Sequence, residues 1–369
     1  MKNIAVFFGG QSTEHDISII TAMQALASLK NYKVYPIYIS PQGEFFSGKR
    51  LTKPQSFLNF SKSGLFSVNF EFGKCNIILK KGVICKKVKI DCALLCNHGH
   101  GGEDGSLQGL LELAGIPYTS SAVASSSIIM DKVLTKIVLR NFSINTPAYV
   151  QFSIAEYEKN KIPLLNKIKS SLGYPVIVKP SRLGSSVGIN ICEKESDIEK
   201  MIESAFVYDE KVIVEKFIEN AREFAVALTR LQGQPIASNV SEIDKGKFYS
   251  FDDKYIEGNH SKKPQIDKKL ENKLKKIAYK CYSALECFGV VRVDFLYDEK
   301  NDIVYVNELN NIPGSLAFNL FNAPFSDLLT TMIMEGIDRA KKQENIVYQF
   351  NSKAIKKYIE LSDHMKYKS

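Results

Sequence analysis

The sequence predicts an α/β protein that begins as a parallel α/β domain and becomes α+β, with antiparallel sheets, in its C-terminal half. Two patterns indicate this fold class. Up to about residue 120, short apolar runs alternate with the apolar spacing of helices. From residue 175 onward, strand-like segments follow one another with hairpin-type turns. The length of 369 residues favours two or three domains, because one domain typically has roughly 100–200 residues.

The N-terminal part alternates strands and helices. Its expected elements are, in order, a strand at 4–8 that ends at Gly9-Gly10, a helix at 19–26, strands at 34–39 and 88–96, and a helix at 107–114. Residues 45–87 are less periodic, which indicates hairpins or insertions. The small polar residues 120–127 predict a linker.

The remainder of the chain is dominated by strand-like segments. The expected strands are 176–178, 187–192, 212–217, 224–229, 290–296 and 303–308, and the expected helices are 130–139 and 268–287. Beyond residue 350 the chain is rich in lysine. We expect a helix end followed by a solvated tail there.

Composition excludes several classes of protein. Apolar residues make up 44% and charged residues 24%, which is ordinary for a globular protein. No apolar run reaches the roughly 18 residues of a membrane-spanning helix, and the N-terminus lacks the apolar core of a secretory signal. The seven cysteines form no Cys-x-x-Cys pair. We therefore expect a reduced cytoplasmic protein without a disulfide framework. The net charge of +9 suits a nucleic-acid partner, a membrane surface or anionic substrates.

The sharpest motif pairs Arg292-x-Asp294 with Glu308-x-Asn310. Residues i and i+2 of a strand share a face, and a turn at 298–302 folds the two strands into a hairpin. Two carboxylates and an amide oxygen then form a site suited to Mg²⁺, beside an arginine for anionic oxygens. The competing interpretation is a solvent-facing hairpin. A site is favoured by the apolar residues expected on the opposite face, Val291, Val293, Phe295 and Val306.

A second motif is the small-residue loop after Lys179. The segment Lys179–Gly188 can cradle phosphates with backbone N–H groups while the lysine supplies positive charge. It lacks the Walker pattern, and a tight hairpin can also be rich in Gly and Ser.

A third motif is the apolar strand Val212–Ile218, which leads to Glu223. Its backbone could contact an adenine, with Glu223 accepting from ribose hydroxyls. An edge strand with charged ends is the alternative.

A fourth motif, Asn97–Gly105, follows a strand and precedes a helix, where open α/β sheets bind ligands. His98, His100, Glu103 and Asp104 could form a zinc cluster, but the glycines favour a flexible substrate loop. The turn from Gly9 to Glu14 reaches the same crevice.

Taken together, these segments resemble the D-alanine–D-alanine ligases of the ATP-grasp superfamily. The resemblance is carried by Phe8–Ser18, His98–Gly105, Val178–Gly188, Arg292–Asp294 and Asn307–Ser315, in this order along nearly the whole chain. It implies an ATP-grasp fold, in which an N-terminal parallel α/β domain precedes two domains that sandwich ATP between antiparallel sheets. It also implies a ligase that joins two D-alanines through an acyl phosphate, for peptidoglycan precursor synthesis. The implied division is 1–125 for the substrate-binding domain, 126–213 and 214–350 for the ATP-grasp subdomains, and 351–369 for a basic tail.

The resemblance also implies roles for individual residues. The expected ATP contacts are Lys132, Lys179, Ser185, Ser186, Glu215, Lys216, Ile218, Glu223, Lys254 and Asn307. The expected catalytic residues are Glu14, Ser185, Tyr255, Arg292 and Gly314, and the expected substrate contacts are Glu14, His98, Ser315, Leu316 and Asn319. Asp294, Glu308 and Asn310 would hold two Mg²⁺ ions, with Mn²⁺ as an alternative. Lys254-Tyr255 lies in the expected lid.

Several alternatives stay open at this stage. The sequence departs from the family pattern at Asn311, at Asn319 and at Lys263–Gln265. These departures lie near the second-substrate pocket or its lid, so a sister ligase using D-serine, D-lactate or another amine is the alternative activity. The resemblance associates Tyr255 with dipeptide-forming members, which argues against D-lactate. A nucleic-acid-binding module is disfavoured, because the lysines are spread along helices and the tail. A non-catalytic nucleotide-binding protein is improbable with the motif residues intact. We expect small-molecule substrates, no nucleic acid, no membrane and a homodimer.

Overall fold

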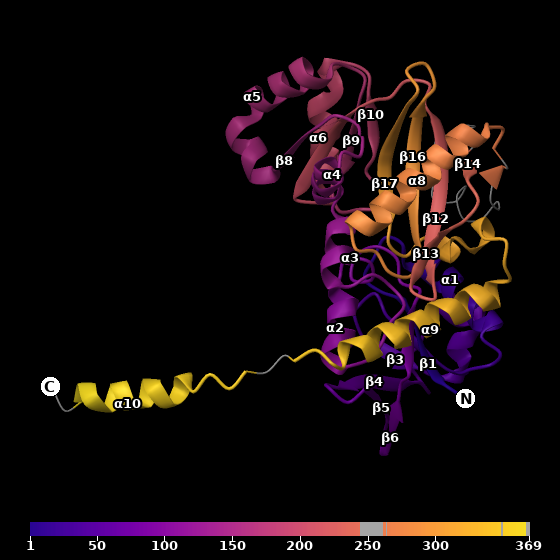
Figure 1. Ribbon diagram of the computed structural model, residues 1–369, viewed down its shortest axis with the longest axis vertical. Coiled ribbons are helices and arrows are strands. Elements are labelled where there is room, and N and C mark those ends of the chain that lie inside the picture. Colours follow the sequence, from indigo (N-terminus) through magenta and orange to yellow (C-terminus); the bar gives the residue numbers. More distant parts are fainter. Residues whose placement is uncertain (244–260, 263, 348–349, 367–369) are drawn as a thin grey trace. The chain divides into compact units, whose positions relative to one another are not determined.

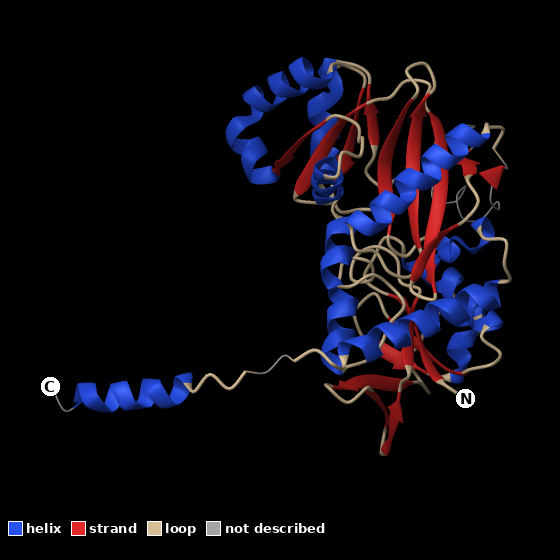
Figure 2. Ribbon diagram, viewed as in Figure 1, coloured by secondary structure: helices blue, strands red, loops and turns tan. Residues whose placement is uncertain are grey.

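The computed structural model describes residues 1–243, 261–262, 264–347 and 350–366. Its chain forms two compact units, residues 1–337 and residues 338–369. The described residues of the first unit form three β-sheets with helices packed against them (Figures 1 and 2). No helix in the described part of the chain combines the length and apolar character needed to cross a bilayer.

The first sheet has seven strands in the order β6-β5-β4-β3-β2-β1-β7. Its strands are β1 (Asn3–Gly9), β2 (Lys33–Ile39), β3 (Phe45–Ser47), β4 (Phe66–Glu71), β5 (Asn76–Lys81), β6 (Ile84–Lys89) and β7 (Cys92–Leu95). Strand β1 pairs in parallel with β2 and β7, and the strands from β3 to β6 add antiparallel hairpins. The expected hairpins at 45–87 are confirmed, and they come with two short 3-10 helices, η1 (Lys49–Thr52) and η2 (Pro54–Phe57).

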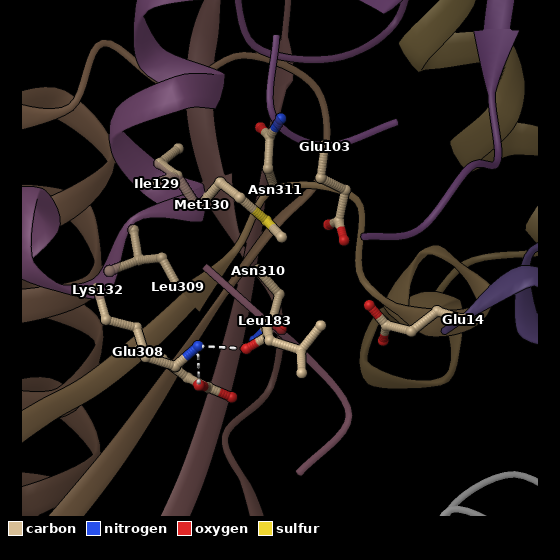
Figure 3. Close-up of a pocket in the computed structure, with 11 residues that line it drawn as sticks. Glu14, Glu103, Ile129, Met130, Lys132, Leu183, Glu308, Leu309, Asn310 and Asn311 are labelled. Carbon is tan, nitrogen blue, oxygen red and sulfur yellow. Dashed lines mark hydrogen bonds and ion pairs between the residues drawn. The ribbon is translucent and has the colours of Figure 1, made fainter. Parts of the chain in front are cut away.

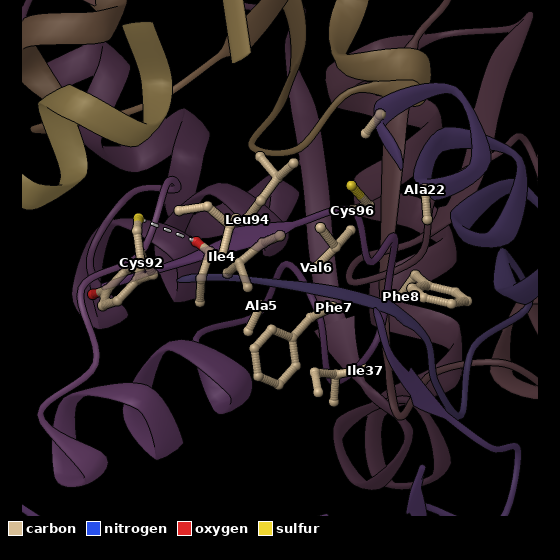
Figure 4. Close-up of a cluster of buried hydrophobic side chains, with 14 of the residues drawn as sticks. Ile4, Ala5, Val6, Phe7, Phe8, Ala22, Ile37, Cys92, Leu94 and Cys96 are labelled. Atoms are coloured by element: carbon tan, nitrogen blue, oxygen red, sulfur yellow. Dashed lines mark hydrogen bonds between the residues drawn. The ribbon is translucent and has the colours of Figure 1, made fainter. Parts of the chain in front are cut away.

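The core of this sheet is the apolar strand β1. Side chains of β1 and β7 pack on both sides of the sheet (Figure 4), together with α1 (His15–Ser28) and α2 (Ser106–Ala114). Both helices were expected. The expected strand 88–96 is instead divided between β6 and β7, because the Ile90 and Asp91 N–H groups bond to Cys75 and Asn3 carbonyls.

Residues 120–127 do not form a linker, contrary to the expectation. They lead into helix α3 (Val123–Met130), followed by α4 (Lys132–Asn141). Several of the serines are buried, and their hydroxyls are hydrogen-bonded. Ser121 Oγ donates to the Phe288 carbonyl at 3.1 Å, and Ser126 Oγ donates to the Ser121 carbonyl at 3.0 Å. A small polar composition therefore marks close packing here.

The second sheet is antiparallel, in the order β10-β9-β11-β8. Its strands are β8 (Tyr149–Ser153), β9 (Val176–Pro180), β10 (Asn190–Cys192) and β11 (Lys211–Lys216). Apolar residues of α5 (Ile154–Leu172) and α6 (Ile198–Phe206) form a core with it; η3 (Glu195–Asp197) precedes α6. The strand expected at 187–192 begins only at Asn190, because a turn continues through Gly188, whose φ is +71°.

The third sheet has six strands, ordered β15-β14-β12-β16-β17 with β13 paired to β12. Its strands are β12 (Arg222–Leu231), β13 (Gln234–Ala237), β14 (Ser241–Ile243), β15 (Ser261–Lys262), β16 (Val291–Asp298) and β17 (Ile303–Asn310). Helix α8 (Lys268–Ala284) shares a core with this sheet, and η4 (Gly314–Leu320) and α9 (Phe325–Gln343) follow it.

The second unit contains α10 (Ala354–Lys366). The sequence analysis expected only a helix end and a solvated tail here. The apolar residues Ile355, Tyr358 and Ile359 follow helical spacing, and the surrounding lysines hide that pattern. These three side chains are exposed.

Candidate active site

The β16–β17 hairpin brings the predicted metal-binding residues together. Asp294 lies opposite Glu308, and Arg292 lies opposite Asn310. The Arg292 guanidinium donates to both Asp294 oxygens, at 2.7 Å each, and Asn310 Nδ2 donates to Asp294 Oδ2 at 3.0 Å. The Asn310 nitrogen is the donor in this bond, so a cation would be bound by its amide oxygen. Two carboxylates and an amide oxygen, all hard ligands, fit a divalent cation of the Mg²⁺ type.

A β-bulge sets which side chains of β17 face this site. Phe295 pairs with Val306, whereas the preceding Asp294 pairs with Glu308, so Asn307 is the extra residue. Strict alternation would place Val306 and Glu308 on one face. The bulge instead leaves Val306 in the apolar core and frees Glu308 for the site.

Lys132 contacts the acidic hairpin from the first turn of α4. Its ammonium lies 3.8 Å from Glu308 Oε2 and donates to the Leu183 carbonyl at 2.6 Å. The Asp131 carboxylate accepts the N–H groups of Val133 and Leu134 and thereby caps this helix. The cap fixes where the helix begins and so fixes the root of the Lys132 side chain.

A buried charge cluster lies beside Lys132. Lys179 Nζ is 2.9 Å from Glu215 Oε2, and Lys136 Nζ is 3.0 Å from Glu215 Oε1. Lys179 also donates to Asn307 Oδ1 at 3.3 Å. Burial alone would raise the pKa of Glu215, but the two ammonium groups outweigh it and lower the pKa to about 2. Glu215 is therefore ionised at neutral pH.

The sequence analysis did not single out Lys136. Its spacing offers one clue: Lys136 follows Lys132 by four residues, so the two lysines are expected on the same face of a helix. The partner Glu215 lies on a distant strand and could not be identified without the fold.

Glu14 lies in a tight enclosure at the opposite side of the pocket. It is buried, with 6% of its surface exposed, and it accepts a hydrogen bond from Ser185 Oγ. A Cβ placed on Gly99 would lie 2.8 Å from Glu14 Oε2, and one on Gly184 would lie 2.7 Å from the same oxygen. The two glycines thus let two loops close around one carboxylate.

His98 is part of a buried chain of hydrogen bonds rather than a metal ligand. Its Nδ1 donates to the Ile312 carbonyl at 2.7 Å, and its Nε2 lies 2.8 Å from Thr21 Oγ1. Thr21 Oγ1 accepts the Ser315 N–H at 3.0 Å. Burial, with a smaller effect of the Arg292 charge, lowers the pKa of His98 to about 4. The imidazole is therefore neutral, with its proton on Nδ1.

The zinc interpretation of this loop is wrong. Both ring nitrogens of His98 have protein partners, and His100 is paired at its ring with Asp104, 3.1 Å away. No group of three or more His, Cys, Asp or Glu side chains suited to a metal occurs among the residues that the structure describes.

Glu103 links the glycine loop to the segment after β17. It accepts the Gly99 N–H at 2.7 Å and the Ile312 N–H at 2.8 Å. Burial, and next the negative charge of Glu14, raise the pKa of Glu103 well above its usual range. The sequence analysis considered Glu103 only as a zinc ligand.

Some of these groups line one pocket (Figure 3). Its lining residues are Glu14, Glu103, Ile129, Met130, Lys132, Leu183, Gly184, Glu308, Leu309, Asn310 and Asn311. In the close-up, Glu14 and Glu103 lie on one side, and Lys132 and Glu308 lie across from them. One end of the pocket can therefore hold an ammonium group and the other can hold phosphate with a cation.

The other residues selected from the sequence are not among the lining residues of this pocket, or lie outside the described residues. Lys216 ends β11, Ile218 lies in the connection to β12, and Glu223 lies in β12. Ser185 and Ser186 have positive φ, as do Ser315 and Leu316, while Gly314 begins η4. Asn319 is exposed on that turn. Lys254 and Tyr255 lie outside the described residues.

Comparison with known proteins identifies relatives over almost the whole chain. Residues 3–121 match the sequence model of the D-Ala D-Ala ligase N-terminus, and residues 138–332 match that of the D-Ala D-Ala ligase C-terminus. The D-alanine–D-alanine ligase of Thermosipho melanesiensis is 39% identical over 370 residues, covering 96% of this chain and 99% of its own. That of Clostridium acetobutylicum is 37% identical, covering 87% and 91%.

Solved structures of similar proteins agree with this relationship. The D-alanine–D-alanine ligase of Helicobacter pylori has a TM-score of 0.77 at 28% identity, covering 91% of this chain and 98% of its own. The VanG D-Ala:D-Ser ligase of Enterococcus faecalis has a TM-score of 0.78 at 30% identity, covering 91% and 99%. The fold is therefore the expected ATP-grasp fold.

Proposed function

Because this chain belongs to the D-alanine–D-alanine ligase family, we propose that it joins two molecules of D-alanine at the expense of ATP. The product, D-alanyl-D-alanine, would enter peptidoglycan precursor synthesis. The observation that carries the proposal is the single pocket that places Glu14 across from Lys132 and Glu308. At one end of the pocket, Glu14 can bind the ammonium group of a substrate. At the other end, Lys132 and Glu308 can bind nucleotide phosphates and a metal ion.

The chemistry explains why both ends are needed. A carboxylate is a poor acyl donor, so the first D-alanine must be converted to an acyl phosphate by phosphoryl transfer from ATP. Such a transfer depends mainly on positioning and on neutralising phosphate charge. Lys132 and Lys179 supply fixed positive charge for this purpose, while Glu14 holds the ammonium of the first D-alanine. Ser185 donates to Glu14, so the small-residue loop and the ammonium site are joined.

Arg292 suits the second half of the reaction. Attack by the amine of the second D-alanine on the acyl phosphate builds negative charge on the carbonyl oxygen. Guanidinium N–H groups of Arg292 donate to Asp294, which fixes the plane of the group. The guanidinium, with the Gly314 N–H, would stabilise that oxyanion. Ser315, Leu316 and Asn319 are proposed for the second carboxylate, and His98 lies close to them through Thr21.

The proposed metal ligands are Asp294, Glu308 and Asn310. Two Mg²⁺ ions are proposed, with Mn²⁺ able to replace them, and they would neutralise phosphate charge when bound. The remaining ATP contacts are proposed as the sequence suggests: Ser186 and Asn307 near the phosphates, Glu215, Lys216 and Ile218 near the adenine, and Glu223 near the ribose. Lys254 and Tyr255 lie outside the described residues and are proposed for the roles that the resemblance implies.

The domain boundaries at 125, 213 and 350, a homodimeric assembly and a cytoplasmic location also belong to this proposal. The second substrate is proposed to be D-alanine, as in the curated relatives. D-serine is the outcome to test against it, because one similar structure is that of a D-Ala:D-Ser ligase.

The test is phosphate release by the purified full chain with ATP, Mg²⁺ and D-alanine, with ATP alone as the control. We expect D-alanine-dependent ADP and phosphate in equal amounts. Mass spectrometry of products from a mixture of D-alanine, D-serine and D-lactate identifies the second substrate. Absence of D-alanine-dependent ADP formation would refute the proposal, and a product ending in D-serine would correct its second substrate.

A further inference from the structure

Lys136 is a buried lysine in helix α4 that belongs to none of the motifs described above. It is 1% exposed, and its ammonium contacts Glu215 on β11 at 3.0 Å. It also lies 3.5 Å from the Asn307 carbonyl on β17. One side chain from α4 therefore touches a strand of the second sheet and a strand of the third.

The charges in this cluster do not cancel. Lys136 and Lys179 share the two oxygens of one ionised carboxylate, Glu215. Two positive charges and one negative charge leave a net charge of +1. Without Lys136, Lys179 and Glu215 would form a neutral pair. Glu308 and Glu223 also act on Lys179 electrostatically, but they are present in every variant compared below, so the variants still differ by the charges of Lys136 and Glu215 alone.

We propose that Lys136 is a positioning residue for nucleotide binding, which neutralises Glu215 so that the positive charge of Lys179 serves the nucleotide phosphates. A buried ammonium that is neutralised by a neighbouring carboxylate attracts phosphate weakly. An ammonium whose charge is not neutralised attracts phosphate strongly where the dielectric constant is low. Lys136 acts through Lys179 and does not itself need to touch the nucleotide. This inference rests on the ATP binding proposed above.

Lys136 also helps to fix the backbone next to Glu308. Lys179 Nζ donates to Asn307 Oδ1, and Lys136 Nζ contacts the carbonyl of that residue. Asn307 is the bulge residue that directly precedes Glu308. The two lysines thus hold the backbone that presents the proposed metal ligand.

The experiment measures how affinity depends on phosphate number. Adenosine, AMP and ADP are titrated calorimetrically into the full chain and into Lys136→Met, which removes the charge and keeps a long apolar stem. We expect adenosine affinity to change by less than about twofold and ADP affinity to fall about tenfold or more, as for loss of one poorly screened unit charge. A purely structural role would weaken all three ligands alike.

A charge series removes any dependence on one variant. Glu215→Gln has a cluster charge of +2, the wild type and the Lys136→Met/Glu215→Gln double variant have +1, and Lys136→Met has 0. We expect the ratio of ADP to adenosine affinity to follow that order, so that the second substitution rescues the first. The double variant also leaves no buried carboxylate short of a partner, so it tests the idea even if Lys136→Met does not fold.

Arg140→Met is the matched control, because it removes one positive charge from α4 one turn further on. The Arg140 guanidinium donates to Thr146 Oγ1 at 3.2 Å and stacks on Tyr149, and its charge reaches Lys136 only at longer range. We expect Arg140→Met to change the affinity ratio much less than Lys136→Met does. Equal losses for adenosine and ADP in Lys136→Met, or an ADP-to-adenosine ratio lower in Glu215→Gln than in wild type, would overturn the inference. Failure of the wild type to bind ADP would instead refute the proposed function.

Discussion

Two glycines of the 97–105 loop provide a matched test of how Glu14 is positioned. Gly99 and Gly101 have nearly the same backbone conformation, with φ of +69° and +74°. A Cβ on Gly101 meets nothing within 4 Å, whereas a Cβ on Gly99 overlaps Ser12 Oγ and lies 2.8 Å from Glu14 Oε2. The two alanine variants therefore share the cost of a left-handed alanine, and only Gly99→Ala also disturbs Glu14.

The expected magnitudes follow from this difference. Each variant should lose about 1–2 kcal/mol of unfolding free energy from the left-handed backbone. Gly99→Ala should lose about 1–3 kcal/mol more from overpacking. Displacement of Glu14 should also weaken binding of the first D-alanine, and each 1.4 kcal/mol lost there corresponds to about a tenfold change.

Urea unfolding and the KM for the first D-alanine are the measurements. We expect Gly101→Ala to keep a nearly normal KM and Gly99→Ala to raise it about tenfold or more. Equal KM values for the two variants would show that the Gly99 contact does not position Glu14, and the ammonium site would then need another explanation.

Three further predictions follow from the same site. Gly184→Ala should raise the KM for D-alanine, because its Cβ would lie 2.7 Å from Glu14 Oε2. It should lose less stability than Gly99→Ala, since it carries the overpacking cost without a positive φ to strain. An unchanged KM would contradict this prediction. Because the pKa of Glu215 falls from 4.5 to about 2 on folding, its contribution to stability is complete above pH 4.5 and is lost as the pH falls toward 2. Urea unfolding at several pH values should therefore show a shallower acid loss in Glu215→Gln than in wild type, and parallel curves would count against the ion cluster. Glu308→Gln should reduce turnover by about a hundredfold or more and raise the Mg²⁺ concentration needed for half-maximal activity, and chelation should abolish wild-type activity; unchanged turnover in the variant would exclude Glu308 as a metal ligand.

The parts of the site that local pattern could predict are those built from neighbouring residues. Arg292 and Asp294 share a face because they are two residues apart on one strand, and the hairpin turn brings Glu308 and Asn310 opposite them. The sequence analysis placed Val306 on the opposite face, which is confirmed, but simple alternation does not explain that placement. The bulge at Asn307 does, and it has no local sequence signal such as a glycine.

The parts that sequence could not supply depend on segments far apart in the chain. Lysines on helices are usually solvated, so the spacing of Lys136 from Lys132 does not predict burial until Glu215 is known to lie against it. The small polar composition of residues 120–127 predicts a linker, because such residues often form loops. Here the hydroxyl of Ser121 both donates to the Phe288 carbonyl and accepts the Phe288 N–H, and these bonds depend on a segment 167 residues away.

The turn after β17 shows how the two halves of the proposed reaction are joined. Ser315, Leu316 and Ala317 all have φ near +50°, which is costly for residues other than glycine, at about 1–2 kcal/mol each. The strain is held by specific bonds: Leu316 N–H donates to the Pro313 carbonyl at 2.7 Å, and Ser315 N–H donates to Thr21 at 3.0 Å. Thr21 belongs to α1, the helix that follows Glu14. Helix α1 therefore holds the strained turn proposed to bind the carboxylate of the second substrate. The same helix begins directly after Glu14, which is proposed to bind the ammonium of the first substrate. A shift of α1 would alter both together.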